Sequence, residues 1–465
     1  MNPSVLIPLV VASALFMENM DGTVIATSLP AIALDLGVNA ISLKLTFTSY
    51  LLSLAIFIPI SGWCAGRFGA RSVFRAAIAV FTFGSIACAF ANSLPGFVVA
   101  RAIQGLGGAM MVPVGRIVIL RTVPKSGLVQ ALSYLTIPAL IGPIIGPVIG
   151  GFITTYFHWR WIFWINLPVG VIGIVLATLY MPNLGEAARA PLDGLGFVLS
   201  GAGLSTLIFG LTIAGRGEAS TSAGAALLVC GTILLVLYVM HARRHLHPII
   251  DLSLLQSLAF RTSVGGGFLF RTGVGAVPFL LPLMLQLGFG MTPFESGTLT
   301  FAAAAGAMLL KFTAPAILRL FGFRKILSFN ALISSAFLGS TALFTAQTSH
   351  LVILIVLFVG GFFRSLQFTA LNAVAYADIP PAKISAATSF SSVVQQLSGS
   401  VGVALAAMVL EISQWSRSAT DLGVRDFSIG FIAVALISAS SAAFHRLLPE
   451  EAGGEISGHS TPSSP

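Results

Sequence analysis

The sequence predicts an all-α polytopic membrane protein, one that crosses the bilayer many times. Of its 465 residues, 56% are hydrophobic, only 8% are charged and 48 are glycine, whereas a soluble domain carries about 25% charged residues. Apolar runs of about 20 residues, the length needed to cross about 30 Å of hydrocarbon, recur along almost the whole chain. Composition and spacing together exclude a soluble globular protein.

By the same length criterion we predict about fourteen membrane helices. Their cores lie near residues 5–27, 45–65, 74–92, 97–120, 128–153, 161–181, 194–215, 222–240, 262–285, 296–318, 326–346, 351–376, 386–410 and 427–447. The first run is too long and too acidic for a cleaved signal peptide, so we interpret it as a membrane helix. The seventh and eighth runs are separated only by a short polar turn around Arg216, Glu218 and Ser220.

The distribution of Lys and Arg between loops predicts the orientation, because positively charged loops stay on the cytoplasmic side. With the amino terminus inside, the cytoplasmic loops hold Arg67, Arg71, Arg75, Arg121, Lys125, Arg189, Arg243, Arg244, Arg261, Arg319, Arg324, Lys325, Lys383 and Arg446. The outer loops hold only Lys44, Arg160, Arg216, Arg417 and Arg425. This asymmetry favours an even number of helices with both termini cytoplasmic. The net charge of +9 then reflects topology and attraction to anionic lipid, without nucleic acid as a partner.

Cysteine and histidine suggest neither a disulfide framework nor a cofactor. The three cysteines, in or beside apolar runs, favour buried, inert thiols: they are Cys64, Cys88 and Cys230. The loop HARRHLHP holds His241, His245 and His247; a metal site is conceivable there, but a solvated basic loop is favoured. We therefore predict no metal and no cofactor.

Weak internal similarity predicts two related halves. The segment GWCAGRFGARSVFR after the second run resembles ILRLFGFRKILSFN after the tenth, each with a glycine between basic residues in a tight turn. In the same way TVPKSGLVQALSYL resembles DIPPAKISAATSF, and both pairs are eight helices apart, as in transporters built from repeats. The predicted domains are a six-helix bundle over 1–181, a linking hairpin over 182–250, a second six-helix bundle over 251–447, and a disordered cytoplasmic tail over 448–465.

Five motifs together resemble one transporter family over nearly the full chain. They are MDGTVIATSLPAI, GWCAGRFGAR, ARAIQGLGGAMMVP, GPIIGPVIGG and WRWIFWINLPVG. The chain is similar to the fourteen-helix drug/proton antiporters of the major facilitator superfamily, EmrB/QacA type. The resemblance implies the major facilitator fold, two six-helix bundles plus an extra two-helix hairpin, and secondary active export; it does not identify the substrate.

Two of these motifs supply candidate gating residues. In GWCAGRFGAR the family usually has an acid at the position of Gly66. In the family that acid helps to close the cytoplasmic side by pairing with basic residues of a neighbouring helix. Because the acid is missing here, we do not assign this closing mechanism to the chain. Gly142, Gly146 and Gly150 form a flat helix stripe that another helix can approach closely, and simple packing explains this stripe as well as gating does. The candidates are Gly62, Arg67, Gly69, Arg71, Gly142, Pro143, Gly146, Pro147 and Gly150.

Acids in the first helix are the candidates for proton coupling. At 1.5 Å per residue, Asp21 should lie roughly 24 Å from the cytoplasmic helix start, at a depth similar to that of Arg101. Glu18 lies three residues earlier on the same face. Ionisable groups inside a membrane are functional candidates because they are costly unless paired or hydrated. The family resemblance places coupling at Asp21 and Arg101; a purely structural ion pair, and a Glu18 that faces hydrated loop ends, are the alternatives.

The second half carries embedded cations but few acids. Arg271 and Arg364 should lie near the midplane, with no evident acidic partner in their own half. We hypothesise a cargo with a carboxylate, phosphate or sulfonate on an apolar body; the alternative is that these arginines bond backbone carbonyls or reach water. The candidate substrate-binding residues are Arg271, Arg364, Gln104, Gln395 and Gln396.

Three classes of function were compared. A proton-coupled exporter of amphiphilic small molecules, for multidrug or organic-anion efflux by alternating access, explains the repeats, acids and motifs together. A lipid flippase or a metabolite or siderophore transporter on the same fold is the alternative. An enzyme is disfavoured, because no nucleophile and base, P-loop or metal-ligand set is found. The expected partners are amphiphilic substrate, protons and membrane lipid; we expect a monomer in the bacterial cytoplasmic membrane, and leave an accessory periplasmic adaptor open.

Overall fold

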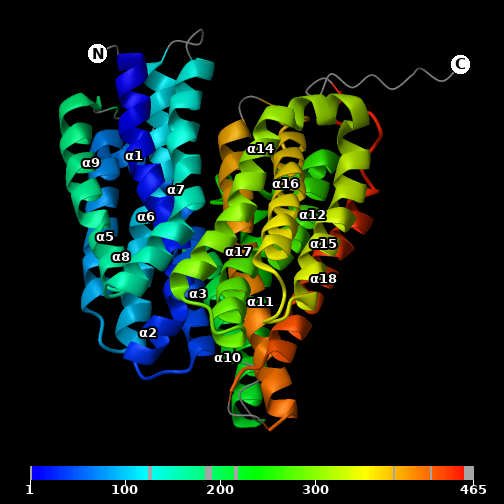
Figure 1. The fold of residues 1–465 in the computed structure, drawn as a ribbon. Coiled ribbons are helices and arrows are strands. Elements are labelled where there is room, and N and C mark those ends of the chain that lie inside the picture. Colours follow the sequence, from blue (N-terminus) through cyan, green and yellow to red (C-terminus); the bar gives the residue numbers. More distant parts are fainter. Residues whose placement is uncertain are drawn as a thin grey trace, which may run out of the picture. The chain divides into compact units, whose positions relative to one another are not determined.

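The computed structural model describes residues 3–123, 128–182, 184, 191–213, 218–380, 383–418 and 421–454, and within them every regular element is helical (Figure 1). The α-helices are α1 (Pro3–Val24), α2 (Leu29–Asp35), α3 (Lys44–Phe57), α4 (Ser61–Phe68), α5 (Ala70–Phe90), α6 (Leu94–Thr122), α7 (Leu128–Tyr156), α8 (Trp161–Trp164), α9 (Asn166–Tyr180), α10 (Gly194–Ile213), α11 (Glu218–Ala242), α12 (Leu258–Gly275), α13 (Val277–Leu283), α14 (Pro293–Lys325), α15 (Ala331–Ser340), α16 (His350–Val374), α17 (Ile384–Ser416) and α18 (Val424–His445). Short 3₁₀ or π segments join several of them into longer rods. The predictions for Lys125, Arg189, Arg216 and the tail beyond residue 454 fall outside the described residues.

Within the described residues, 12 helices are long and apolar enough to cross a membrane. The all-helical membrane prediction is therefore confirmed, whereas this count does not confirm about fourteen helices. The difference arises partly at Pro293–Leu343, a run of 51 residues. This run contains the predicted core 296–318 and most of the core 326–346, and its backbone departs from helical geometry at Gly322.

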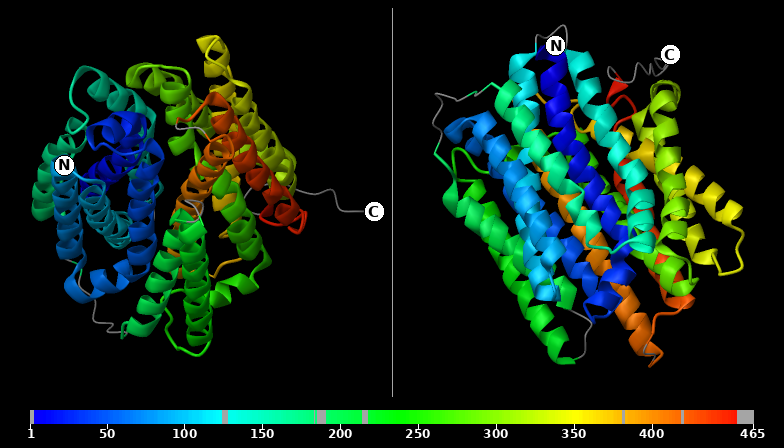
Figure 2. Two further views of the ribbon diagram at one scale, coloured as in Figure 1. Left: turned by 90° about the horizontal axis from the view of Figure 1, so that it is seen from below. Right: turned by 60° about the vertical axis from the view of Figure 1, so that its left-hand side comes forward.

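The chain forms two compact units. Unit 1 comprises Met1–Leu207, Val229–Ile249 and Thr292–Gly297, and unit 2 comprises Ile208–Leu228, Ile250–Met291 and Thr298–Pro465. In unit 1, α1 packs on α7 and α9, and α6 packs on α3 and α5 (Figure 2). In unit 2, α12 packs on α16, α17 and α18. Each unit therefore builds its own interior.

In unit 1, α7 packs closely against α1 because glycines on α7 carry no side chain. A Cβ on Gly142 would lie 3.0 Å from the carbonyl oxygen of Phe16, and a Cβ on Gly150 would collide with that of Val24. Gly146 meets the side chain of Thr23 in the same way. The predicted flat stripe is thus present, and its neighbour is the helix that carries the acids.

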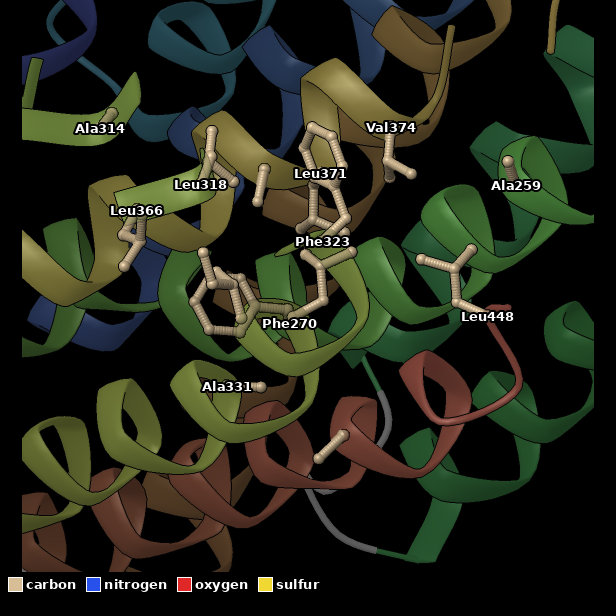
Figure 3. Packing of buried hydrophobic residues seen from close by; sticks show 14 of the residues in the cluster. Ala259, Phe270, Ala314, Leu318, Phe323, Ala331, Leu366, Leu371, Val374 and Leu448 are labelled. Atoms are coloured by element: carbon tan, nitrogen blue, oxygen red, sulfur yellow. The ribbon is translucent and has the colours of Figure 1, made fainter. Parts of the chain in front are cut away.

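A buried apolar cluster holds five helices of unit 2 together, namely α12, α14, α15, α16 and α18. Phe270 from α12 and Leu371 from α16 are fully buried, and Phe323 from α14 is 1% exposed (Figure 3). Ala442 from α18 joins the same cluster. Replacing a buried Phe by Ala typically costs about 3–5 kcal/mol, so this packing fixes the position of α12 and of the arginine that follows Phe270.

The two predicted tight turns share one backbone feature. Gly69, between α4 and α5, has φ 86°, and Gly322, inside the 51-residue run, has φ 70°. Only glycine adopts this left-handed region without strain. The sequence similarity between the two segments therefore has a matching turn conformation, which supports the interpretation of an internal repeat.

Candidate functional site

A buried ion pair joins α1 and α6 in unit 1. Arg101 Nη1 donates to Asp21 Oδ2 over 2.6 Å. Arg101 is fully buried, and Asp21 is 3% exposed. Removing either partner would leave an uncompensated charge in a low dielectric, so each charge depends on the other. The pairing expected from matching depth is present, and its role in proton coupling stays a prediction.

Two buried amide side chains complete the environment of Asp21. Gln104 Nε2 donates to Asp21 Oδ1 over 2.8 Å, and Asn166 Nδ2 donates to the same oxygen over 2.9 Å. Gln104 also accepts from Arg101 Nη1 over 2.6 Å, so it contacts both charges. Asn166 is held in turn by a hydrogen bond to Ser85 Oγ over 2.9 Å. We call Asp21, Arg101, Gln104 and Asn166 the charge cluster.

Close helix approaches bring the charge cluster together. A Cβ on Gly84 of α5 would lie 2.6 Å from the backbone nitrogen of Gln104, and one on Gly105 of α6 would lie 2.6 Å from the carbonyl oxygen of Tyr50. The three helices α3, α5 and α6 can therefore pack with their backbones nearly in contact. The guanidinium carbon of Arg101 lies 4.3 Å from the ring centroid of Tyr50, a cation–π contact that adds to the ion pair.

Several polar atoms around the charge cluster keep unused bonding capacity. Arg101 Nε and Nη2 and Asn166 Oδ1 are buried without a hydrogen-bond partner among the described residues. Glu18 Oε2 and the hydroxyl of Tyr50 share this condition. Buried polar groups are normally paired, so these atoms are available to a water, a proton or a cargo group.

Glu18 lies beside the charge cluster. Its carboxyl carbon and the Tyr50 hydroxyl both lie within 4 Å of the position that a Cβ on Gly108 would take. The absence of a side chain at Gly108 therefore leaves room for the acid against α6. Arg116, also on α6, is close enough for its charge to act on Glu18.

The predicted gating residues fall into two structural settings. Gly69 forms the left-handed turn between α4 and α5, and Gly62 is exposed, with open space where a Cβ would stand. Arg67 is exposed and Arg71 is half-buried. The α7 stripe, with Pro143 and Pro147, lies in one uninterrupted helix. Their gating role stays a prediction.

In unit 2, Arg271 is buried and has no carboxylate partner in the described part of the chain. Its Nη2 donates to Asn372 Oδ1 over 2.7 Å, and its guanidinium carbon lies 5.7 Å from the ring centroid of Phe368. Its Nε has no hydrogen-bond partner among the described residues. A small pocket with room for about one water molecule lies beside it, bordered also by Tyr376 and Ser391. This pocket presents hydrogen-bond donors and no acid.

The other candidate binding residues lie in more open settings. Arg364 is half-buried on α16 and makes no hydrogen bond or ion pair within the described part of the chain. On α17, Gln395 is exposed and Gln396 is half-buried. Gln104, by contrast, belongs to the charge cluster. Its predicted role in substrate binding is untested, but its hydrogen bonds are to Asp21 and Arg101.

Sequence reasoning missed Asn166, Tyr50 and Arg116. Asn166 stands in WRWIFWINLPVG as a lone amide in an apolar run, a signal that could have been used. Tyr50 gave no such signal, because its contact with Arg101 depends on how α3 packs against α6. Arg116 was overlooked as a cation inside the fourth apolar run.

These features define a class of protein. Twelve candidate spans among the described residues, two compact units and a buried ion pair inside the spans are the features of a secondary transporter. The sequence matches the Major Facilitator Superfamily over residues 11–194 and 263–461. The chain therefore belongs to this superfamily, whose members transport small molecules and are not enzymes.

Curated relatives of the chain include bacterial proteins named "Putative multidrug resistance protein MdtD". The chain is 34% identical to the one from Citrobacter koseri over 449 residues, which is 95% of this chain and 94% of the relative. It is 35% identical to the one from Shigella sonnei over 447 residues, again 95% and 94%.

Solved structures share the fold at low sequence identity. The POT family transporter PepTSo has a TM-score of 0.72 at 17% identity, covering 95% of this chain and 97% of that chain. A D-xylose–proton symporter has a TM-score of 0.66 at 16% identity, covering 97% and 98%. The human organic anion transporter MFSD10 has a TM-score of 0.63 at 12% identity, covering 96% and 100%. At these identities the likeness establishes the fold alone.

Proposed function

We propose that this protein is a proton-coupled exporter of amphiphilic small molecules that works by alternating access. The observation that carries the proposal is the Asp21–Arg101 ion pair, which is fully buried between two membrane helices and supported by Gln104 and Asn166. The MdtD relatives are named as putative multidrug resistance proteins, which supports efflux of several drugs as the physiological role.

The geometry suggests how a proton could be coupled to movement. Protonation of Asp21 removes the negative charge that stabilises Arg101, and a buried cation without a partner is strongly unfavourable. Arg101 must then move toward water or receive another anion, such as Glu18 or a cargo group. Gln104 and Asn166 can still hydrogen-bond a neutral carboxyl group. Proton binding and helix movement would therefore be linked through one pair.

The direct test is transport in inside-out vesicles with an imposed pH gradient. We expect cargo uptake that rises with the gradient and stops when an ionophore collapses it. A rate of uptake into wild-type vesicles that does not depend on the pH gradient would exclude proton coupling. Movement of a labelled lipid in place of a soluble cargo would favour the flippase alternative.

We also propose fourteen membrane helices with both termini in the cytoplasm, arranged as the halves 1–181 and 251–447, the hairpin 182–250 and the tail 448–465. The support is that Pro293–Leu343 is long enough for two spans and that α7 has 29 residues. In addition, α10 and α11 fall in the gap between the two segments that match the superfamily. Reporters after residues 190 and 250 should read cytoplasmic, and one in the 216–222 turn should read periplasmic. If the reporter at 216–222 is cytoplasmic, the predicted two-helix hairpin is wrong.

For the cargo we propose an apolar body with one anionic group, held by Arg271 and Arg364 with Gln395 and Gln396 nearby. The support is that Arg271 forms no ion pair among the described residues and keeps an unpaired Nε beside a small pocket. Binding of matched anionic, neutral and cationic amphiphiles to wild type and to Arg271→Gln and Arg364→Gln proteins tests this. Preferred binding of cations, with anion binding unchanged in both variants, would exclude it.

We assign gating to the turn at Gly62, Arg67, Gly69 and Arg71 and to the α7 stripe with its two prolines. A left-handed glycine at the turn and close α1–α7 packing support rigid-body movement of α7 with α1.

Besides the cargo, the proposed partners of the transporter are protons and bilayer lipid. We further propose the cytoplasmic membrane as the location and a monomer as the working unit, with a periplasmic adaptor as an accessory to be tested by co-purification.

A further inference from the structure

Two histidines lie on one face at the end of α11. His241 belongs to the last turn of the helix, and the backbone nitrogen of His245 donates to the carbonyl oxygen of His241 over 3.0 Å. The helical turn therefore continues through His245, and the four-residue spacing places both imidazoles on the same side. Their ring centroids are 5.0 Å apart. Two histidines at this spacing on a helix are a common pair of metal ligands.

The third group comes from the start of α10. Asp193 Oδ1 accepts from the backbone nitrogen of Gly196 over 2.8 Å, which fixes the carboxylate as a helix cap. Asp193 is 4% exposed, and Oδ1 lies 2.7 Å from His241 Nε2.

We propose that Asp193, His241 and His245 form a binding site for a divalent transition-metal ion, with Zn²⁺ as the ion that fits best. One ligand atom from each residue lies within 4.8 Å of the others. Zinc binds imidazole nitrogen at about 2.0–2.1 Å and carboxylate oxygen at about 2.0–2.2 Å, so small side-chain rotations would bring all three onto one ion. Water would fill the remaining position.

The ligand chemistry selects the class of ion. Imidazole nitrogens suit Zn²⁺, Co²⁺ and Ni²⁺, whereas Mg²⁺ and Ca²⁺ prefer sites made of oxygen alone. His245 Nδ1 accepts from the backbone nitrogen of His247 over 3.3 Å, a long hydrogen bond that a metal ion at either ring nitrogen would replace, because ligation through Nε2 requires the ring proton on Nδ1. A bound ion would join the start of α10 to the end of α11, two points 48 residues apart in the sequence.

The alternative interpretation, that Asp193 only caps the start of α10, does not explain the position of His245. The hydrogen bonds of Asp193 to Gly196 and His241 form a complete cap without His245. His245 nevertheless has its ligand atom within reach of both groups. It is therefore the residue that separates the two interpretations: a metal site needs it, and a cap does not.

The test uses the full-length protein, purified in detergent with an affinity tag that contains no histidine. Zn²⁺ is titrated by calorimetry, and Co²⁺ is used as a spectroscopic probe of nitrogen ligation. We expect binding of one equivalent by wild type and a loss of affinity of about 100-fold or more in His245→Ala and Asp193→Asn, since even outer partners of a metal site contribute about 10- to 100-fold. His247→Ala is the matched control and should bind as wild type does.

Thermal unfolding gives a second readout that separates metal binding from misfolding. Without metal, His245→Ala should melt at the wild-type temperature, because the Asp193 cap is intact. Added Zn²⁺ should raise the melting temperature of wild type and His247→Ala but not of His245→Ala. The proposal is overturned if wild type binds no Zn²⁺, if His245→Ala binds it as tightly as wild type, or if Mg²⁺ competes equally.

Discussion

In unit 1, Arg101 donates to a carboxylate 2.6 Å away and to the side-chain oxygen of a neighbouring amide. In unit 2, Arg271 donates to the amide oxygen of Asn372 over 2.7 Å and has no carboxylate partner among the described residues. Both guanidinium groups also face an aromatic ring. Protonation of the paired carboxylate would leave the first cation without its counter-charge. The second cation has no internal acid, so it can bind an anionic group of a cargo molecule. This difference is the reason why we propose coupling in one unit and cargo recognition in the other.

The largest effect should come from breaking the ion pair in unit 1. Asp21→Asn keeps the size of the side chain but leaves Arg101 uncompensated, so we expect proton-driven transport to be abolished and stability to fall by about 3–5 kcal/mol. Vesicle transport and denaturation in mixed micelles measure the two effects. The double variant Asp21→Asn with Arg101→Gln should recover most of the stability but none of the coupling, because removing both charges leaves no buried ion.

The control for this experiment is Asp35→Asn. Asp35 pairs with Arg160 over 2.6 Å, but both side chains are partly exposed. Exposed pairs contribute at most about 1 kcal/mol, so this variant should transport normally. Full pH-driven transport by Asp21→Asn would contradict the coupling assignment and make Glu18 the next candidate.

A second prediction uses a close contact that occurs in both units. A Cβ on Gly150 would collide with the Val24 carbonyl of α1, and a Cβ on Gly402 would collide with the Thr272 carbonyl of α12. Alanine at either position should cost about 1–3 kcal/mol through overpacking, whereas Gly62→Ala has open space and should cost less. Because α1 carries Asp21, only Gly150→Ala should also change the pH dependence of transport. Equal pH profiles for the Gly150 and Gly402 variants would weaken the division of roles.

A third prediction compares the two arginines under one substitution. Arg101→Gln breaks an ion pair and should destabilise the protein strongly, whereas Arg271→Gln breaks none and should change stability by less than about 1.5 kcal/mol, the contribution of a typical hydrogen bond. Arg271→Gln should instead weaken binding of an anionic amphiphile by about 10-fold, equivalent to about 1.4 kcal/mol. If Arg271→Gln is as unstable as Arg101→Gln, Arg271 has a structural partner and the comparison fails.

The smallest effect concerns an ion pair in unit 2 outside the membrane spans. Burial raises the pKa of Asp251, but hydrogen bonds from Ser253 and the charge of Lys383 hold it below its usual value. Because the pKa of Asp251 is lower in the folded state, the ionised carboxylate stabilises the fold at pH values above the unfolded-state pKa, which is about 3.9. This stabilisation is lost as the pH falls through the folded-state pKa. Asp251→Asn should therefore cost less than about 1 kcal/mol at pH 7, since Lys383 is half-exposed. The difference from wild type should shrink in thermal unfolding as the pH falls through the lowered folded pKa of Asp251.

The membrane class, most of the helix cores and the partnership of Asp21 with Arg101 could be predicted from the sequence alone. The physical reason is that a chain crossing lipid must keep its backbone helical, so a residue's depth follows from the rise per residue. A buried acid and base at one depth are then natural partners. The glycine turns at Gly69 and Gly322 could also be predicted, because few other residues adopt their backbone conformation.

Only the tertiary structure decided which side chains surround those charges. Depth gives a residue's height along a helix, but its neighbours depend on the rotation and packing of every helix around it. Gln104 therefore joined the charge cluster although it was expected to contact cargo, and Asn166 reached Asp21 from 145 residues away. In the same way Arg271 met Asn372 from α16, and Asp193 met His241 from the far end of the next helix. These contacts depend on how helices far apart in the sequence pack against one another, which the residues next to each side chain do not determine.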